Sequence, residues 1–284
     1  MERYSRQALA LGIDVESKVH GLSVLIAGCG ALGTAVAESL ARMGVKKIVA
    51  VDADVVELSN LHRVHLFTER DVGRPKVDVC RERVNEINSE VEFESHHDVI
   101  SPENAERYVS IADIVVDALD SLYPRLVLND ACVKLNKPLI YAGVNREYIT
   151  VKLVIPKETS CLSCFINYQP EGANVCETLG TVITATTIAA NLEVQLILDY
   201  LRGYKEDELI IAELDSLTFQ KVKMRRNPNC RTCMRQEFPF LKGEIPPGQC
   251  DLLRVNERSE VFRVVKTGSY VKICYPEGCF IRRR

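Results

Sequence analysis

The chain has 284 residues, of which 46% are hydrophobic, and this is enough apolar surface for a buried core. Its 36 Lys and Arg residues nearly balance 39 Asp and Glu residues, giving a formal net charge of -3. This balance gives no support to broad binding of nucleic acid or of a membrane surface. No signal segment is recognised, and no apolar run reaches the roughly 18 residues of a membrane span, so we expect a cytoplasmic protein.

Short apolar segments alternate with helical patterns along the first half of the chain. A β-branched run at Leu22–Ala27 precedes a glycine turn, after which Ala31–Met43 has helical spacing and ends at Gly44. Strands are expected next at Lys47–Asp52, Asp113–Asp117 and Pro138–Tyr141, with helices from Pro75 and over Arg125–Leu135. The alternation predicts an α/β, Rossmann-like, doubly wound fold with a mostly parallel sheet.

The second half predicts two more strands, at Ile149–Ile155 and Ile210–Met224, on either side of a helix from about Leu179 to Leu201. A Pro- and Gly-rich segment at Glu237–Gly248 predicts a linker to strands near Glu260–Val265 and Tyr270–Cys274. We therefore expect a main domain at residues 1–236 and a small β-rich extension at residues 237–284.

Three glycines form a loop between the first strand and the first long helix. Gly28, Gly30 and Gly33 permit a tight turn, close approach of the backbone to phosphate, and close helix packing. Asp52 ends the next strand, where a carboxylate can hold ribose hydroxyls. Taken alone, this pattern favours an NAD-dependent dehydrogenase.

The polar residues that follow Asp52 change this interpretation. Asp54, Asn60, Arg63 and Lys76 come after it in order, within the runs Ser59-Asn60-Leu61-His62-Arg63 and Gly73-Arg74-Pro75-Lys76. A dehydrogenase has no need of this set, whereas the triphosphate of ATP requires more cationic neutralisation than a dinucleotide. The series therefore favours an ATP site.

The same series resembles the ThiF/MoeB/HesA family of the ubiquitin-activating-enzyme-like superfamily. Members carry an Asp-x-Asp, a Ser-Asn-Leu-x-Arg and a Gly-x-Pro-Lys motif at this spacing, and the chain has each in order. Two positions differ from many members: Ser121 stands where they have Asn, and Val64 where they have Gln. The resemblance implies an enzyme that adenylates a carboxylate, with ATP and Mg²⁺ as cofactors.

The resemblance also implies roles for further residues. In the opening run Arg3-Tyr4-Ser5-Arg6-Gln7, the second arginine of the family motif reaches the neighbouring subunit's ATP site, which implies this role for Arg6 and a homodimer. In Asp117-Ala-Leu-Asp120-Ser121, the family's metal-holding aspartate corresponds to Asp120. The expected ATP-binding set is Gly28, Gly30, Ala31, Gly33, Asp52, Asp54, Asn60, Arg63, Lys76, Asp120 and Ser121.

Four of the 11 cysteines form two Cys-x-x-Cys pairs, Cys161 with Cys164 and Cys230 with Cys233. Two such pairs supply the four thiolates of a closed, tetrahedral, structural Zn²⁺ site. The alternatives are a redox pair or a disulfide, which the expected cytoplasmic location disfavours. MoeB and ThiF have similarly placed pairs, so we predict a zinc knot.

Cys176 lies between the first pair and the long helix, where a helix N-terminus lowers the pKa of a thiol. Its placement resembles that of the cysteine which attacks the acyl-adenylate in ubiquitin-activating enzymes and ThiF. The alternative is a buried or idle thiol, because MoeB-type members adenylate without it. The candidate catalytic residues are Arg6, Asn60, Arg63, Lys76, Asp120 and Cys176.

The function implied is ATP-dependent adenylation of the C-terminal Gly carboxylate of a ubiquitin-like or sulfur-carrier β-grasp protein. If Cys176 is a nucleophile, thioester or persulfide transfer through its thiol follows. A separate sulfur donor or conjugating enzyme would then be a partner. Three alternatives stay open. They are the dehydrogenase, a non-catalytic regulatory subunit, and a family member that activates a carboxylate on tRNA or on a small peptide.

Overall fold

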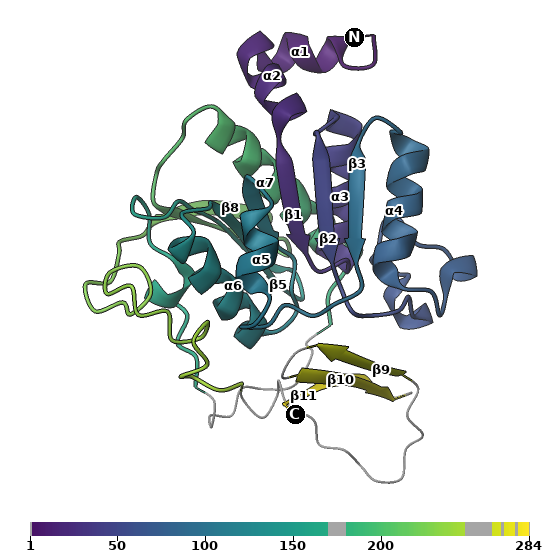
Figure 1. The fold of residues 1–284 in the computed structure, drawn as a ribbon. Helices are drawn as coiled ribbons and strands as arrows, with labels where there is room; N and C mark the ends of the chain where they lie inside the picture. Colours follow the sequence, from purple (N-terminus) through teal and green to yellow (C-terminus); the bar gives the residue numbers. More distant parts are fainter. Residues whose placement is uncertain (1, 170–179, 248–262, 268–269, 276–277, 284) are drawn as a thin grey trace.

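The computed structural model describes residues 2–169 and 180–247 and the backbone of residues 263–267, 270–275 and 278–283 (Figure 1). A mixed sheet of eight strands occupies its centre. The first five strands in sheet order run parallel, and the last three add to them antiparallel. In sheet order they are β3 (Glu92–His96), β2 (Lys47–Val51), β1 (Ser23–Ala27), β4 (Ile114–Asp117), β5 (Leu139–Asn145), β6 (Tyr148–Val154), β7 (Glu208–Glu213) and β8 (Thr218–Lys223).

Helices cover both faces of this sheet. The α-helices of the described residues are α1 (Ser5–Leu11), α2 (Ile13–Gly21), α3 (Ala31–Met43), α4 (Lys76–Ile87), α5 (Ala105–Ser110), α6 (Leu122–Lys134) and α7 (Ile183–Leu201). Short 3₁₀ helices are η1 (Leu58–Asn60), η2 (Glu69–Asp71) and η3 (Leu162–Cys164). Among these described helices, none combines the length and the apolar composition needed to cross a membrane.

The alternation of side chains along β1 shows why two layers of helices are needed. Val24 and Ile26 face the core formed with α3, α4 and α7, while Leu25 and Ala27 face the core formed with α5 and α6. All four side chains are fully buried. A strand buried on both faces is typical of a parallel sheet between helical layers. The predicted α/β fold with a mostly parallel sheet is confirmed.

One predicted strand is wrong. Ile210–Met224 is not a single strand, because β7 and β8 pair antiparallel on either side of a turn. Asp215 and Ser216 cause the reversal: the Ser216 N–H donates to the Asp215 carboxylate, and Leu217 has a positive φ of 52°. The apolar pattern continues through this turn and conceals it.

Other differences concern the limits of elements. The helix α7 begins at Ile183, after an extended Val182, rather than at about Leu179. The strand β3 is a half-exposed edge strand of mixed composition, and α5 is short, so neither had a sequence pattern strong enough to predict it.

The N-terminal helices lie at the amino end of β1, above the sheet in Figure 1. Arg3 and Gln7 fasten them by donating to the backbone carbonyls of Ile87 and Met43, 2.9 and 3.0 Å away. The side chains of Leu9 and Ile13 are 79% and 82% exposed. The N-terminal segment is thus fixed in place but leaves two large apolar side chains uncovered within the described part of the chain.

Near the C-terminus, β9 (Arg263–Thr267), β10 (Tyr270–Tyr275) and β11 (Gly278–Arg283) form a separate antiparallel sheet. The first two correspond to the strands expected near residues 260–265 and 270–274, and β11 was not expected. Within the predicted linker, Phe240 and Leu241 are buried in the core beside α6. The division into residues 1–236 and 237–284 stays a prediction.

Candidate nucleotide site and four-cysteine cluster

The glycine loop is closely packed on its inner side and open at its middle. Gly28 has a positive φ of 100°, and a Cβ there would lie 2.5 Å from the carbonyl oxygen of Ala118. A Cβ on Gly33 would lie 1.9 Å from the carbonyl oxygen of Gly28. Around Gly30, a Cβ would meet no described atom within 4 Å. Side chains are therefore excluded where the loop meets the protein, while Gly30 faces space that a phosphate could fill.

Asp52 fixes this loop to the end of β2. Its carboxylate accepts from the Cys29 N–H at 2.7 Å and from the Asp54 N–H at 2.6 Å. Each carboxylate oxygen keeps a further lone pair. Asp52 is thus oriented by the backbone and retains acceptor capacity for the hydroxyls of a ribose.

Lys76, the first residue of α4, is surrounded by acidic residues. Its Nζ lies 3.0 Å from Asp54 Oδ2. Burial opposes its charge, but Asp52, Asp54 and Asp120 outweigh burial and raise the pKa of Lys76 above its usual value. The predicted Asp52, Asp54, Lys76 and Asp120 are therefore neighbours, and Lys76 is an ammonium throughout the neutral pH range.

Asp120 follows β4 and is exposed at the end of the sheet where the glycine loop lies. Ser121 is the N-cap residue of α6. Arg125, in the first turns of α6, donates to the backbone carbonyl of Leu119, and its Nε lies 3.0 Å from Asp117 Oδ2. The segment carrying Asp120 is thus held by a buried guanidinium.

This guanidinium belongs to a buried group of charges that we did not predict. Its carbon lies 4.7 Å from the ring centre of Tyr141, and Glu193 on α7 is fully buried nearby. Burial raises the pKa of Asp117 to about 6, although Arg125 opposes the shift, and burial also raises the pKa of Glu193. One arginine with two buried carboxylates favours a proton on the less well paired Glu193.

Asn60 and Arg63 lie in and after η1, in a segment that packs beside α3. The N–H of His65 donates to Thr34 Oγ1 at 3.2 Å and so attaches this segment to the second turn of α3. Asn60 Oδ1 accepts from the Glu57 N–H, and Arg63 Nη1 donates to the Ser59 carbonyl. In the described part of the chain, neither side chain bonds to Lys76 or Asp120. The role of Asn60 and Arg63 as phosphate ligands therefore stays a prediction.

Arg6 and Cys176 are the two remaining candidates. Arg6 is exposed on α1, at the end of the sheet opposite to the glycine loop, so it does not contribute to the nucleotide site of its own chain (Figure 1). Cys176 lies outside the described residues.

The four predicted metal-binding cysteines do converge. Their sulfur atoms lie within 4.8 Å of one another, with Sγ–Sγ distances of 4.0 Å (Cys161–Cys164), 3.7 Å (Cys161–Cys230) and 3.4 Å (Cys164–Cys233). Four sulfurs about 2.3 Å from a tetrahedral Zn²⁺ are separated by roughly 3.8 Å, whereas bonded sulfurs are about 2.05 Å apart. The arrangement fits a metal-binding cluster, and the four thiols are not joined by disulfide bonds in this structure.

Comparison with known proteins agrees with this geometry. The fold and the site define a nucleotide-binding protein of the doubly wound α/β class. Residues 4–232 match the ThiF family, and the chain belongs to that family.

Several relatives are similar over most of the chain. The sulfur carrier protein ThiS adenylyltransferase of Bacillus subtilis is 35% identical over 250 residues, covering 85% of this chain and 74% of the relative. Protein HesA of Leptolyngbya boryana is 30% identical, covering 82% and 85%. The crystal structure of E. coli MccB with ATP superposes with a TM-score of 0.72 at 27% identity, covering 81% of this chain and 74% of that one.

The packing of the loop leads to a pair of predictions. Gly33→Ala should lower the free energy of unfolding by about 1–3 kcal/mol, because the new methyl group overlaps the Gly28 carbonyl. Gly30→Ala should lower stability by no more than about 1 kcal/mol, the cost of alanine at the N-cap of α3, but should weaken ATP binding, because its methyl group projects into the proposed phosphate space. Urea unfolding and calorimetric titration with ATP measure the two effects.

Gly21→Ala is the matched control, because a Cβ at this position at the end of α2 meets no atom within 4 Å. It should change neither quantity by more than the small gain expected from alanine in a helix. Normal ATP affinity in Gly30→Ala would contradict the placement of the phosphates.

Proposed function

We propose that the chain is an adenylyltransferase that uses ATP to activate the C-terminal Gly carboxylate of a sulfur-carrier or ubiquitin-like β-grasp protein, releasing pyrophosphate. The observation that carries the proposal is the meeting of Lys76, Asp52, Asp54 and Asp120 beside an open glycine loop. It is supported by the ThiF family match and by the adenylyltransferase name of the Bacillus subtilis relative.

Each residue has a physical task in this reaction. Asp52 orients the ribose, the glycine loop and the N-terminus of α3 hold phosphate oxygens, and Lys76 supplies a permanent positive charge. The carrier carboxylate attacks the α-phosphorus in line, the bond to the bridging oxygen breaks, and pyrophosphate leaves. Catalysis is positioning together with stabilisation of the charge that develops on the phosphate oxygens.

The charge balance of the site supports a requirement for Mg²⁺. Asp52, Asp54 and Asp120 provide three negative charges against the single positive charge of Lys76, before the negative triphosphate enters. Mg²⁺ prefers carboxylate and phosphate oxygens, so the exposed carboxylate of Asp120 is the suitable protein ligand. Asp120 would hold the ion where it could neutralise charge on the phosphates. Asn60 and Arg63 complete the proposal as ligands that turn toward the phosphates when ATP binds.

The alternatives fit the site less well. An NAD-dependent dehydrogenase has no use for Lys76 among three carboxylates, and the family match disfavours it. A regulatory subunit has no need of this complete set of polar residues. Members acting on tRNA or on a small peptide share the same ATP residues, so the identity of the carboxylate has to come from experiment.

Zinc in the four-cysteine cluster is part of the same proposal. The Sγ–Sγ distances support it, since they match a closed tetrahedral site. A closed site has no open coordination position, so its role is structural. A reducing cytoplasmic location, which keeps the thiols unoxidised, belongs to this proposal.

Pyrophosphate exchange tests the adenylation step. In the presence of ATP, Mg²⁺ and a carrier ending in Gly-Gly, Asp120→Asn should lower the exchange rate at least about 100-fold, because a carboxylate that positions charge on the transition state is lost. Glu103→Gln, which changes an exposed carboxylate on the α5 side of the sheet, is the control and should retain the rate. If no carrier protein of the source cell supports exchange, assays with tRNA and short peptides decide among the alternatives. Exchange that survives in Asp120→Asn contradicts the role of this residue.

The place of Arg6 on the side opposite to the glycine loop supports a homodimer in which each subunit completes the other's site. Arg6→Ala and Asp120→Ala should each be inactive as pure proteins. A heterodimer of the two, isolated through two different affinity tags, should regain about half of the wild-type exchange rate, because one of its two sites is intact. A heterodimer as inactive as its parents would show that Arg6 acts within its own chain or not at all.

Cys176 is proposed as the thiol that receives the acyl group from the adenylate, with AMP as the leaving group. Cys176→Ala should abolish a thiol-sensitive adduct between enzyme and carrier, detected by denaturing electrophoresis without reductant, while pyrophosphate exchange continues. An adduct that persists in the variant assigns the transfer to another thiol. A sulfur donor or a conjugating enzyme would act after this step.

A further inference from the structure

Two adjacent, fully buried polar residues of α6 each hold one half of the four-cysteine cluster. Asn129 holds the first half: its Oδ1 accepts from the Leu162 N–H at 3.0 Å, and its Nδ2 donates to Ser163 Oγ at 3.3 Å. Leu162 and Ser163 are the two residues between Cys161 and Cys164. The side chain of Asn129 therefore fixes the backbone turn that presents these two thiols.

Asp130 holds the second half in the same way. Its Oδ1 accepts from Thr232 Oγ1 at 2.6 Å, and Thr232 lies between Cys230 and Cys233. Its Oδ2 accepts from the N–H groups of Phe240 and Leu241 at 2.9 and 3.2 Å, where the chain leaves the cluster. All three partners are donors, so only a group with two acceptor atoms satisfies them.

Burying the Asp130 carboxylate costs free energy, which its hydrogen bonds have to offset. Asp130 is fully buried, and a charge removed from water is retained only with compensating hydrogen bonds. An apolar side chain at the same position would fill the space without this cost, but it could not join the 230–241 segment to α6. The buried pair therefore determines where the two halves of the cluster lie.

The same helix holds the nucleotide site at its N-terminal end. Arg125, about one turn before Asn129, binds Asp117 and the carbonyl of Leu119, and the N-cap Ser121 follows Asp120 directly. One rigid element is thus attached at its start to the loop bearing Asp120 and at its middle to both pairs of cysteines. A displacement of the cluster would be transmitted to Asp120 through α6.

We propose that Asn129 and Asp130 are positioning residues that join both halves of the cluster to α6 and thereby couple metal loading to ATP binding at Asp120. The positioning of the cluster goes beyond the proposed function. The coupling to ATP binding rests on the proposed function and on the proposed zinc. Hydrogen-bonded groups behind metal ligands typically change metal affinity 10–100-fold when removed. The cluster is therefore expected to depend on residues whose side chains bond to the segments carrying the cysteines rather than to the metal.

Two variants of Thr232 form a matched pair that tests the positioning of the cluster. Thr232→Val keeps the shape but removes the hydroxyl that donates to Asp130 and lies 3.2 Å from Ser163 Oγ, whereas Thr232→Ser keeps this hydroxyl. In the full chain loaded with Zn²⁺, Thr232→Val should release zinc to a chromogenic chelator about 10–100 times faster than the wild type. Thr232→Ser should stay within about threefold.

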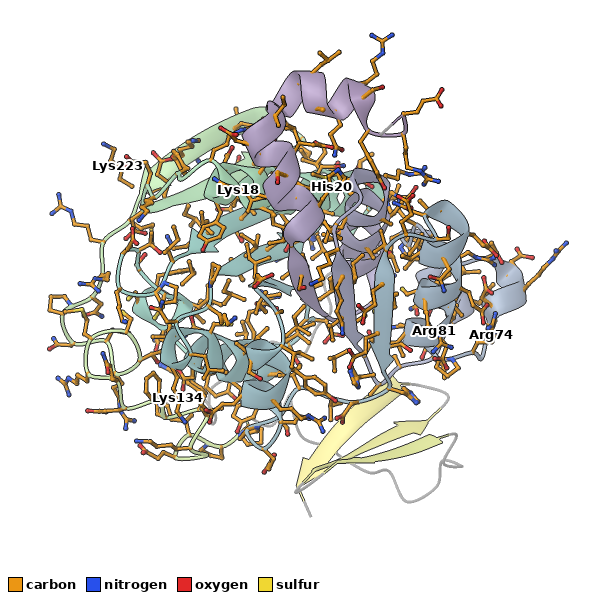
Figure 2. The ribbon with its side chains drawn as sticks, turned by 45° about the horizontal axis from the view of Figure 1, so that its top comes forward. Lys18, His20, Arg74, Arg81, Lys134 and Lys223 are labelled. Carbon is orange, nitrogen blue, oxygen red and sulfur yellow. The ribbon has the colours of Figure 1, made fainter. Side chains whose placement is uncertain are left out.

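A spectroscopic measurement separates positioning from general loss of stability. With Co²⁺ in place of Zn²⁺, Thr232→Val should alter the visible absorption bands of the tetrathiolate site, while Thr232→Ser should keep them. Lys134→Gln, at the exposed far end of α6, removes an ion pair with Glu106 and is the stability control (Figure 2). Equal zinc release and identical Co²⁺ spectra in Thr232→Val and the wild type would overturn the positioning role.

The proposed coupling has to act in both directions, because two linked sites change each other's binding affinity by the same factor. Saturating ATP with Mg²⁺ should strengthen zinc binding by at least about fivefold, and removing zinc should weaken ATP binding by an equal factor. Zinc affinity that does not respond to bound ATP would refute the coupling. A chain that binds no ATP at all would instead refute the proposed function, while the zinc-release measurements would still decide the role of Asp130.

Discussion

The close approach of two backbone segments, at Gly28 and Ala118, brings the nucleotide site together. Since β1 and β4 are parallel neighbours, their carboxyl ends meet at one edge, and the absence of a side chain at Gly28 lets the two following loops touch. Asp52 then joins the end of β2 to the same loop through the Cys29 N–H. The site is therefore a consequence of strand order combined with one position that tolerates no Cβ.

The sequence was most informative at residues whose type is required both by the local backbone conformation and by the chemistry of the site. The glycines, the strand-end aspartates and the lysine after Pro75 predicted both the fold and the centre of the site, and the Cys-x-x-Cys spacing predicted the cluster. The buried partners could not be predicted, because Arg125, Asn129, Asp130 and Glu193 lie within helical patterns that otherwise indicate ordinary core positions. Their roles depend on contacts with residues far away in the chain. The hairpin at Asp215–Ser216 was missed because the apolar pattern continues on both sides of the turn.

The contrast between Lys76 and Glu193 shows how packing assigns charge. Both lie in the interior part of the molecule, yet Lys76 is surrounded by carboxylates and keeps its proton as a cation, while Glu193 shares one arginine with Asp117 and is favoured as a neutral acid. Lys76 lies among the carboxylates of the proposed nucleotide site, whereas Glu193 lies near Asp117 and Arg125. A neutral Glu193 adds no negative charge to a protein that, in the proposed function, has to bind a triphosphate.

The separation of the cysteine pairs along the chain has a consequence for the unfolded protein. A metal held by both pairs closes a loop containing residues 165–229, and restricting a loop of this length removes entropy from the unfolded chain worth about 4 kcal/mol in the chain-entropy treatment of cross-links. The loop contains α7 and the strands β7 and β8, whereas β6, the antiparallel neighbour of β7, precedes it in the chain. The order in which β7 and β8 join the sheet during folding would then depend on when the metal arrives.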